Sequence, residues 1–250
     1  MNLYQVIPGP PRTINFSTAR ERAALAPTLR PPVTPWVRAI MVTDPAGHTV
    51  DSSGSSRGLT RGADRALLAL YRENADVVIV GAETLRREPV PTPRHTPLVI
   101  VSRSGDLRGH QLIVREGGRF LLVTSEAGAT RQASEGALPG AEVVTLPGPG
   151  PFPAREILDS LTGRAETGNV LVEGGRALWE TFAPITHELC VATTGAPRDE
   201  RAGVPEWWPH PPDSLALHSL MTDDTQMLYY RYLTPLGGES PDQRPEADLS

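Results

Sequence analysis

The sequence contains no lysine, and all 24 of its basic side chains are arginine. Its 29 acidic residues bring the formal net charge to -5 at pH 7. We therefore expect no broad basic surface and no nucleic-acid partner. An acidic protein can still hold a local arginine pocket, so small anionic molecules remain open as ligands.

Cysteine is also scarce. Cys190 is the only one, which excludes an intrachain disulfide and a multi-cysteine zinc site. It lies in the apolar run HELCVA (187–192), which favours a buried structural thiol over a nucleophile. The six histidines lack metal-ligand spacing, so we expect no metal, and without a GxSxG elbow there is no sign of a hydrolase triad.

No apolar run approaches the ~20 residues that a membrane-spanning helix requires. The first residues, MNLYQVIPGPPR, lack the apolar core of a signal peptide. We therefore expect a cytoplasmic protein with no membrane partner.

The 250 residues are enough for one large domain with a buried core. Residues 1–35 are rich in proline, and we predict an N-terminal arm with at most one short helix, over 18–26. Residues 236–250 are polar and are predicted to be a tail. The domain itself is then expected over 36–235.

Within that domain, strand-like and helix-like segments alternate. This order predicts an α/β fold in a single domain, with a mostly parallel central sheet, helices on both faces and an antiparallel C-terminal hairpin. Strands are predicted at 36–43, 76–80, 97–102, 119–124, 141–146, 170–172, 188–192, 215–220 and 226–232, and helices at 61–73, 154–161 and 176–182.

Two of the predicted strand-to-helix turns contain glycine. They are VIVGAETLRRE (78–88) and VLVEGGRALWE (170–180). Glycine allows close approach of a ligand to the backbone, and the start of a helix suits a phosphate. The alternative is that these glycines only permit tight turns, because neither segment is a GxGxxG fingerprint.

Five arginines cluster near these turns, and their guanidinium groups match phosphate oxygens. We expect one or two of them to touch a ligand and the rest to be solvated. They are Arg86, Arg87, Arg94, Arg103 and Arg176.

Glu173 ends the second of these strands, where it would face a ligand cleft. The alternative is that its carboxylate stabilises the dipole of the helix that follows.

With these motifs in view, the chain resembles the reductase domain of the bacterial riboflavin-biosynthesis deaminase-reductases, and especially the stand-alone homologues of actinobacteria. That family has the dihydrofolate-reductase-like fold. The resemblance covers residues 36–235 and is carried by SSGSSRGLT (52–60), ADVVIVGAETLRRE (75–88), PLVIVSRSGDL (97–107), NVLVEGGRALWETF (169–182), HELCVA (187–192) and LMTDDTQMLYYRYL (220–233).

The resemblance implies a homodimeric, NADPH-dependent reductase that transfers hydride to a pyrimidine ribosylamine phosphate. At matching positions, the residues expected near the cofactor are Gly81, Thr84, Glu88, Ser102, Arg103, Gly174, Gly175, Arg176, Ala177 and Leu178, with Ser102 and Arg103 at the 2'-phosphate. Those expected near the substrate are Ser56, Arg65, Arg94 and Glu173.

The first strand of the domain departs from the family pattern. Ile40 stands where the family has Lys or Asn, and Ala46 where it has Asp, while Asp44 comes two residues earlier. Asp44 is then the only candidate proton donor on this strand, and water is the alternative donor. The departure favours a related heterocycle or imine as substrate, or, as the alternative, a nucleotide-binding member that has lost or changed the reductase activity.

Overall fold

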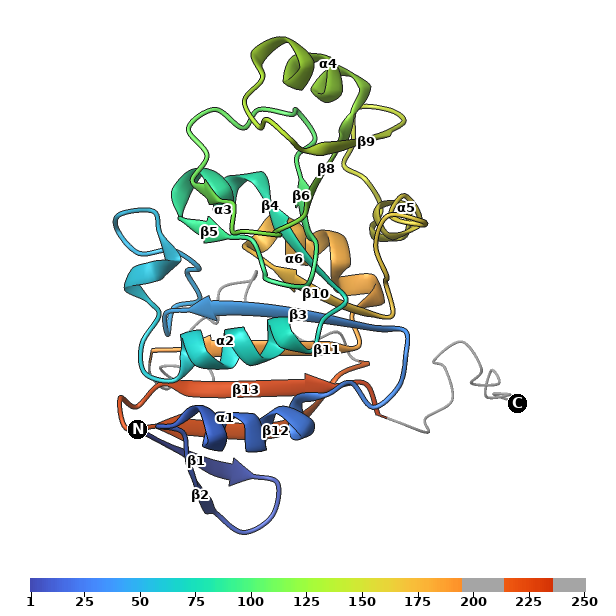
Figure 1. Cartoon of the computed structure of the whole chain (residues 1–250). Coiled ribbons are helices and arrows are strands. Elements are labelled where there is room, and N and C mark those ends of the chain that lie inside the picture. Colours follow the sequence, from blue (N-terminus) through green and yellow to red (C-terminus); the bar gives the residue numbers. More distant parts are fainter. Residues whose placement is uncertain (195–213, 236–250) are drawn as a thin grey trace, which may run out of the picture.

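The computed structural model describes residues 1–194 and 214–235 (Figure 1). The predicted tail at 236–250 lies outside the described residues. The strands are β1 (Asn2–Ile7), β2 (Arg12–Asn15), β3 (Trp36–Thr43), β4 (Val77–Gly81), β5 (Val90–Pro91), β6 (Leu98–Val101), β7 (Leu112–Ile113), β8 (Phe120–Ser125), β9 (Glu142–Leu146), β10 (Asn169–Glu173), β11 (Glu188–Thr193), β12 (Ala216–Asp223) and β13 (Leu228–Leu233).

The α-helices are short and connect the strands. They are α1 (Ala19–Leu25), α2 (Asp64–Glu73), α3 (Ala82–Arg87), α4 (Glu126–Glu135), α5 (Ala154–Asp159) and α6 (Arg176–Phe182). Three 3-10 turns join them at Ala26–Leu29, Ser56–Gly58 and Ala183–Ile185. No helix among the described residues is long and apolar enough to cross a membrane.

One large sheet organises the domain, in the strand order β2-β1-β12-β13-β11-β3-β10-β4-β6-β8-β9. The pairs from β11 to β9 are parallel, and those from β11 through β13, β12 and β1 to β2 are antiparallel. The predicted α/β domain, with its mostly parallel sheet and antiparallel C-terminal hairpin, is therefore confirmed.

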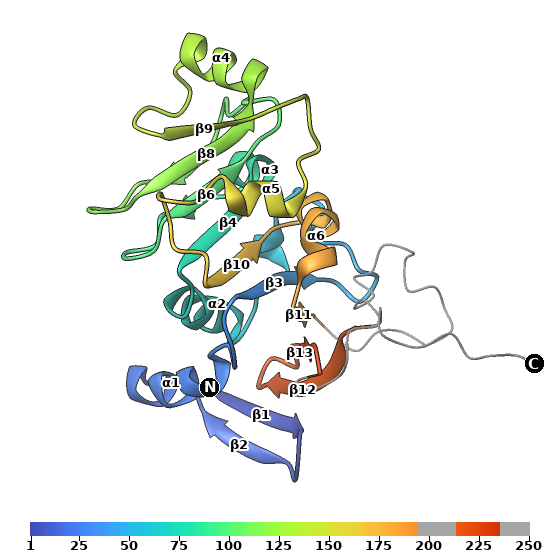
Figure 2. The same cartoon turned by 90° about the vertical axis from the view of Figure 1, so that its right-hand side faces the viewer.

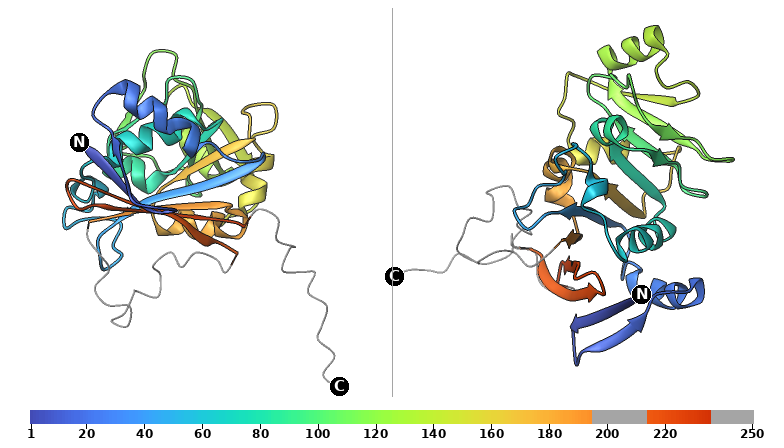
Figure 3. Two further views of the ribbon diagram at one scale, coloured as in Figure 1. Left: turned by 90° about the horizontal axis from the view of Figure 1, so that it is seen from below. Right: turned by 90° about the vertical axis from the view of Figure 1, so that its left-hand side faces the viewer.

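Helices cover both faces of the sheet. Val77–Val80 of β4 are completely buried, as expected for a parallel strand with both faces covered. α1 and α2 lie on one face and α6 on the other (Figures 2 and 3). The two faces carry separate apolar clusters, with Leu67 and Leu70 of α2 in one and Leu178 and Phe182 of α6 in the other.

The N-terminal residues differ from the prediction. The helix predicted over 18–26 is confirmed as α1, but the preceding residues form the hairpin β1–β2, which extends the sheet beside β12. Leu3 and Phe16 are fully buried there and hold the hairpin to the domain. The helix α4 was not predicted either, because its sequence, EAGATRQASE, is mostly small and polar.

The parallel strands all end at the same edge of the sheet. Neighbouring strands β3, β10, β4 and β6 are followed there by the segments that carry the predicted site residues. This carboxyl edge is where open α/β sheets bind their ligands.

Candidate functional site

The two glycine turns lie side by side. β10 and β4 are paired, with Glu173 opposite Val80, so the turns leave the sheet from adjacent strands. A methyl group at position 174 would lie 3.8 Å from Thr84 Oγ1 and 3.3 Å from Leu178 Cδ2. The structure thus brings Thr84 of the first turn to Gly174 of the second.

The backbone of these turns is open to a ligand. Among the described residues, a methyl group at Gly81 would meet no atom within 4 Å, and one at Gly175 would meet only Thr49 Oγ1, at 3.6 Å. Gly175 also begins α6 as its N-cap residue. Glycine at these positions allows a ligand to approach the backbone more closely than any other residue would.

The residues predicted at the 2'-phosphate, Ser102 and Arg103, directly follow the next strand of the sheet, β6. Ser102 follows β6, is buried, and donates its backbone N–H to the carbonyl of Val123 (3.0 Å). The carbonyl of Arg103 accepts a hydrogen bond from Ser125 Oγ (2.8 Å), which fixes the turn, while the Arg103 side chain is exposed. A methyl group at Gly150 would lie 2.8 Å from Arg103 Cδ, so the loop around Gly150 lines the same place.

The five clustered arginines divide into two groups. Arg86 and Arg87 are paired with Glu83, and Arg176 is paired with Glu180 at the start of α6. Among the described residues, neither Arg94 nor Arg103 makes a side-chain hydrogen bond or ion pair. Of these two, Arg103 lies beside the glycine turns.

The remaining predicted residues at the start of α6 have different environments. Ala177 is exposed, whereas Leu178 is buried and packs against Gly174. Leu178 therefore supports the backbone of the turn, and its side chain is not available to a ligand.

Glu173 is engaged by an arginine that the sequence did not indicate. Its Oε1 accepts from Arg72 Nε at 2.6 Å and its Oε2 from Arg72 Nη2 at 2.5 Å, with only 9% of Glu173 exposed. The predicted alternative, a helix-stabilising carboxylate, is wrong: Gly175 caps α6 without a side-chain hydrogen bond, and the first turn holds no acid. Arg72 lies 101 residues away in the sequence, so no local pattern could reveal this pair.

Ser56 and Glu88 are hydrogen-bonded to each other. The backbone N–H and the hydroxyl of Ser56 both donate to the Glu88 carboxylate, at 2.5 and 3.0 Å. Arg87 Nη1 adds a bond to the carbonyl of Gly54 (3.3 Å). These contacts attach the loop after β3 to the end of α3.

The two arginines that were predicted near the substrate, Arg65 and Arg94, lie in different parts of the fold. Arg65 is exposed on the first turn of α2. Arg94 lies two residues before Thr96, whose hydroxyl donates to the carbonyl of Ala75 at the amino end of β4 (3.1 Å). Arg94 is therefore near the opposite edge of the sheet, and the structure does not bring it to the glycine turns.

Asp44 follows β3 directly and folds back on its own loop. Its Oδ2 lies 2.8 Å from His48 Nδ1, and its Oδ1 accepts the His48 backbone N–H at 2.8 Å. Partial burial opposes ionisation of Asp44, but the hydrogen bonds from His48 outweigh this, and the pKa of Asp44 lies below its ordinary value. The segment DPAGH is typical of a turn, with polar residues at both ends that could meet, and this is the only local signal for the pair.

Ile40 lies opposite both Glu173 and Cys190 in the sheet, and it lines a cavity of about 20 Å³ between α2 and the strands. Burial raises the pKa of Asp64, another lining residue, to about 6. Cys190 is buried as predicted, and burial, followed by the nearby Glu188, raises the pKa of its thiol to about 12.

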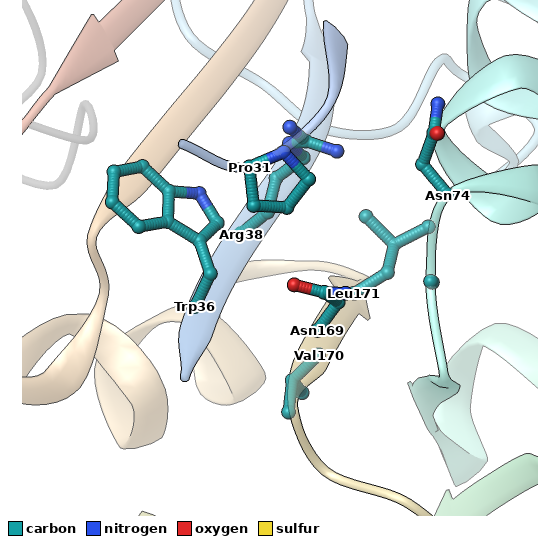
Figure 4. Close-up of a pocket in the computed structure, with 8 residues that line it drawn as sticks. Pro31, Trp36, Arg38, Asn74, Asn169, Val170 and Leu171 are labelled. Carbon is teal, nitrogen blue, oxygen red and sulfur yellow. The ribbon is translucent and has the colours of Figure 1, made fainter. Parts of the chain in front are cut away.

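A second hollow lies at the amino ends of β3 and β10, away from the glycine turns (Figure 4). The hollow is too tight to admit a water molecule, so we assign no ligand to it. Arg38 Nε and Asn169 Oδ1, on residues that line it, have no hydrogen-bond partner among the described residues.

The strand order and the two adjacent glycine turns define an α/β protein whose predicted ligand-binding residues gather at the carboxyl edge of its sheet. Residues 36–184 match the sequence model of the RibD C-terminal domain, which is well over half of the chain. The protein belongs to that family. No curated protein is similar enough in sequence to give a match.

Solved structures share the fold. A pyrimidine reductase-like protein from Corynebacterium diphtheriae is 23% identical, with a TM-score of 0.60 over 80% of this chain and 92% of the other. A deaminase/5-amino-6-(5-phosphoribosylamino)uracil reductase from Thermotoga maritima is 19% identical, with a TM-score of 0.57 over 81% and 57%. A riboflavin biosynthesis reductase from Saccharomyces cerevisiae is 12% identical, with a TM-score of 0.51 over 82% and 92%.

Proposed function

We propose that the protein is an NADPH-dependent reductase that transfers hydride to a pyrimidine ribosylamine phosphate or to a related heterocycle or imine. The observation that carries the proposal is the meeting of the two glycine turns, Gly81–Thr84 and Gly174–Gly175, on adjacent strands. Family membership supports the same reaction, because the T. maritima relative is described as a uracil reductase.

The bound nicotinamide would supply the hydride. The chain's own residues would bind and orient it. Gly81, Gly174 and Gly175 leave the backbone accessible to the pyrophosphate. The guanidinium of Arg103, which no described residue pairs, would hold the 2'-phosphate and so distinguish NADPH from NADH.

The substrate side of the site supports a change from the riboflavin precursor. Ile40 presents an apolar side chain, and both oxygens of Glu173 are engaged by Arg72. These features favour a substrate less polar than a pyrimidine at this position. They also support the alternative function, that of a family member that binds nucleotide without the usual reduction.

The test is NADPH oxidation by the purified full-length protein against a panel that contains the pyrimidine ribosylamine phosphate and several cyclic imines. We expect turnover with at least one imine and little with the pyrimidine. Gly175→Leu should abolish turnover, because its side chain would fill the place of the cofactor. Arg108→Ala, at an exposed arginine paired with Asp106, is the matched control and should leave turnover unchanged. NADPH binding without oxidation by any compound would favour the alternative.

Homodimeric assembly stays a prediction. Tyr4 and Val6 are exposed on β1, and the solution mass of the protein would test whether they are covered by a second copy.

A further inference from the structure

We infer that His48 is the proton donor of the reduction and that Asp44 is its positioning residue. This inference rests on the proposed function and names a residue of that same site. It replaces the expectation, drawn from the sequence, that Asp44 itself donates the proton.

The geometry of the loop defines the pair. Asp44 Oδ2 lies 2.8 Å from His48 Nδ1. The backbone is closed around this contact, since the Asp44 N–H donates to the His48 carbonyl (2.9 Å) and the Gly47 N–H donates to the Asp44 carbonyl (2.9 Å). Gly47 has a φ of 87°, which suits glycine at this turn. The carboxylate therefore fixes both the orientation of the ring and the tautomer with the proton on Nδ1.

The same loop lies over the cofactor turn. A methyl group at Gly175 would lie 3.6 Å from the hydroxyl oxygen of Thr49, the residue after His48. The loop leaves β3, and β3 is the direct neighbour of β10, which carries Gly174 and Gly175. His48 is thus held at the junction of the substrate strand and the nucleotide turn.

Neighbouring charged groups are less suited to donate the proton. Asp44 is held ionised by its bonds to His48. Both oxygens of Glu173 accept from Arg72, and Arg176, on the facing turn, is paired with Glu180. Ile40 and Ala46 carry no ionisable group at all. The side chain of His48 is 63% exposed, so solvent can reprotonate it after each turnover.

The chemical step balances with these groups. A bound nicotinamide would supply the hydride, with its electron pair, to the carbon of a substrate C=N bond. The π electrons of that bond move to the nitrogen, which takes the Nε2 proton of the His48 imidazolium, while Nδ1 keeps its proton and its contact with Asp44. The products are the amine, the oxidised nicotinamide and a neutral imidazole, which then takes a proton from water.

The first test needs no substrate. Histidine-ring proton NMR of the full-length protein is recorded with and without NADPH, and His48→Gln assigns the His48 signals. We expect NADPH to shift the His48 ring signals and to give cross-relaxation with the nicotinamide protons. His95, an exposed histidine close to Arg94 at the opposite edge, is the control and should not respond.

The second test compares a cyclic imine with its N-methylated iminium ion, which accepts hydride but needs no proton. We expect His48→Gln to slow reduction of the imine about 100-fold or more, in the range of general acid catalysis, and to leave the iminium rate and NADPH affinity unchanged. Asp44→Asn should slow reduction of the imine less than His48→Gln does. It should also change the alkaline side of the pH-rate profile of imine reduction.

The outcomes separate the two ideas. If His48→Gln slows both compounds equally or neither, or if NADPH leaves the His48 signals unmoved, the role of His48 is overturned while the reductase stands. If the wild-type protein binds no NADPH, the proposed function fails and the role of His48 fails with it.

Discussion

Replacing Glu173 by glutamine would leave the Arg72 guanidinium with an uncompensated charge in a largely buried place. Only 11% of the Glu173 side chain and 18% of the Arg72 side chain are exposed. Breaking one partner of a buried pair costs about 3–5 kcal/mol, and because some solvent reaches this pair and glutamine keeps one acceptor, we expect about 2–3 kcal/mol. For a chain of this size the loss corresponds to a fall in Tm of about 5–10 °C.

The assay is thermal and urea unfolding of the wild type, Glu173→Gln, Arg72→Met and the double variant. The double variant should recover most of the loss, because it removes both charges together. NADPH affinity should stay unchanged in all four proteins, since the pair lies beneath the turn. If Glu173→Gln keeps the wild-type Tm and instead weakens the binding of substrate, the carboxylate faces the ligand and the Arg72 contact is not the role we assign to it.

Three further predictions concern single groups. The raised pKa of Asp64 means that the folded state holds this proton while the unfolded chain loses it, so stability falls as pH rises from about 4 to 6. Asp64→Asn should therefore stabilise the protein, by about 1 kcal/mol more at about pH 7.5 than at about pH 5 in urea unfolding; an equal gain at both would contradict this. Arg103→Ala should weaken NADPH about tenfold or more and leave NADH unchanged in a binding titration, whereas loss of both would make it a general cofactor contact. Cys190, buried with a pKa of about 12, should resist alkylation until the chain unfolds, and rapid labelling of the native protein would refute its structural role.

Most of the parallel sheet could be predicted from the sequence because its strands are short apolar runs between glycines and polar turns. The residues Trp36–Thr43 and Arg176–Phe182 form the predicted strand and helix with the predicted bounds. The sequence pattern predicts a start of α2 at residue 61, three residues too early, because residues 61–63 continue its pattern but form a turn, with the Ala63 N–H bonded to Asp223. The hairpin β1–β2 could not be predicted, because the prolines around it interrupt the strand pattern in the sequence.

The site was predictable in part. Both glycine turns were visible as motifs, and parallel pairing at one edge brings such turns together. The partners of the polar groups were not visible, because Arg72 with Glu173 and Ser56 with Glu88 join residues far apart in the sequence. The position of Arg94 depends on the path of the connection PTPRHT (91–96). This sequence does not indicate toward which edge of the sheet Arg94 lies.

The central claim is that the two glycine turns and Arg103 form a site for NADPH. Its most direct test is a titration of the purified protein with NADPH and, separately, with NADH, followed by nicotinamide fluorescence. We predict saturable micromolar binding of NADPH, about tenfold or more tighter than NADH, which corresponds to about 1.4 kcal/mol. Equal binding would remove Arg103 from the site, and absence of binding by both nucleotides would contradict the account.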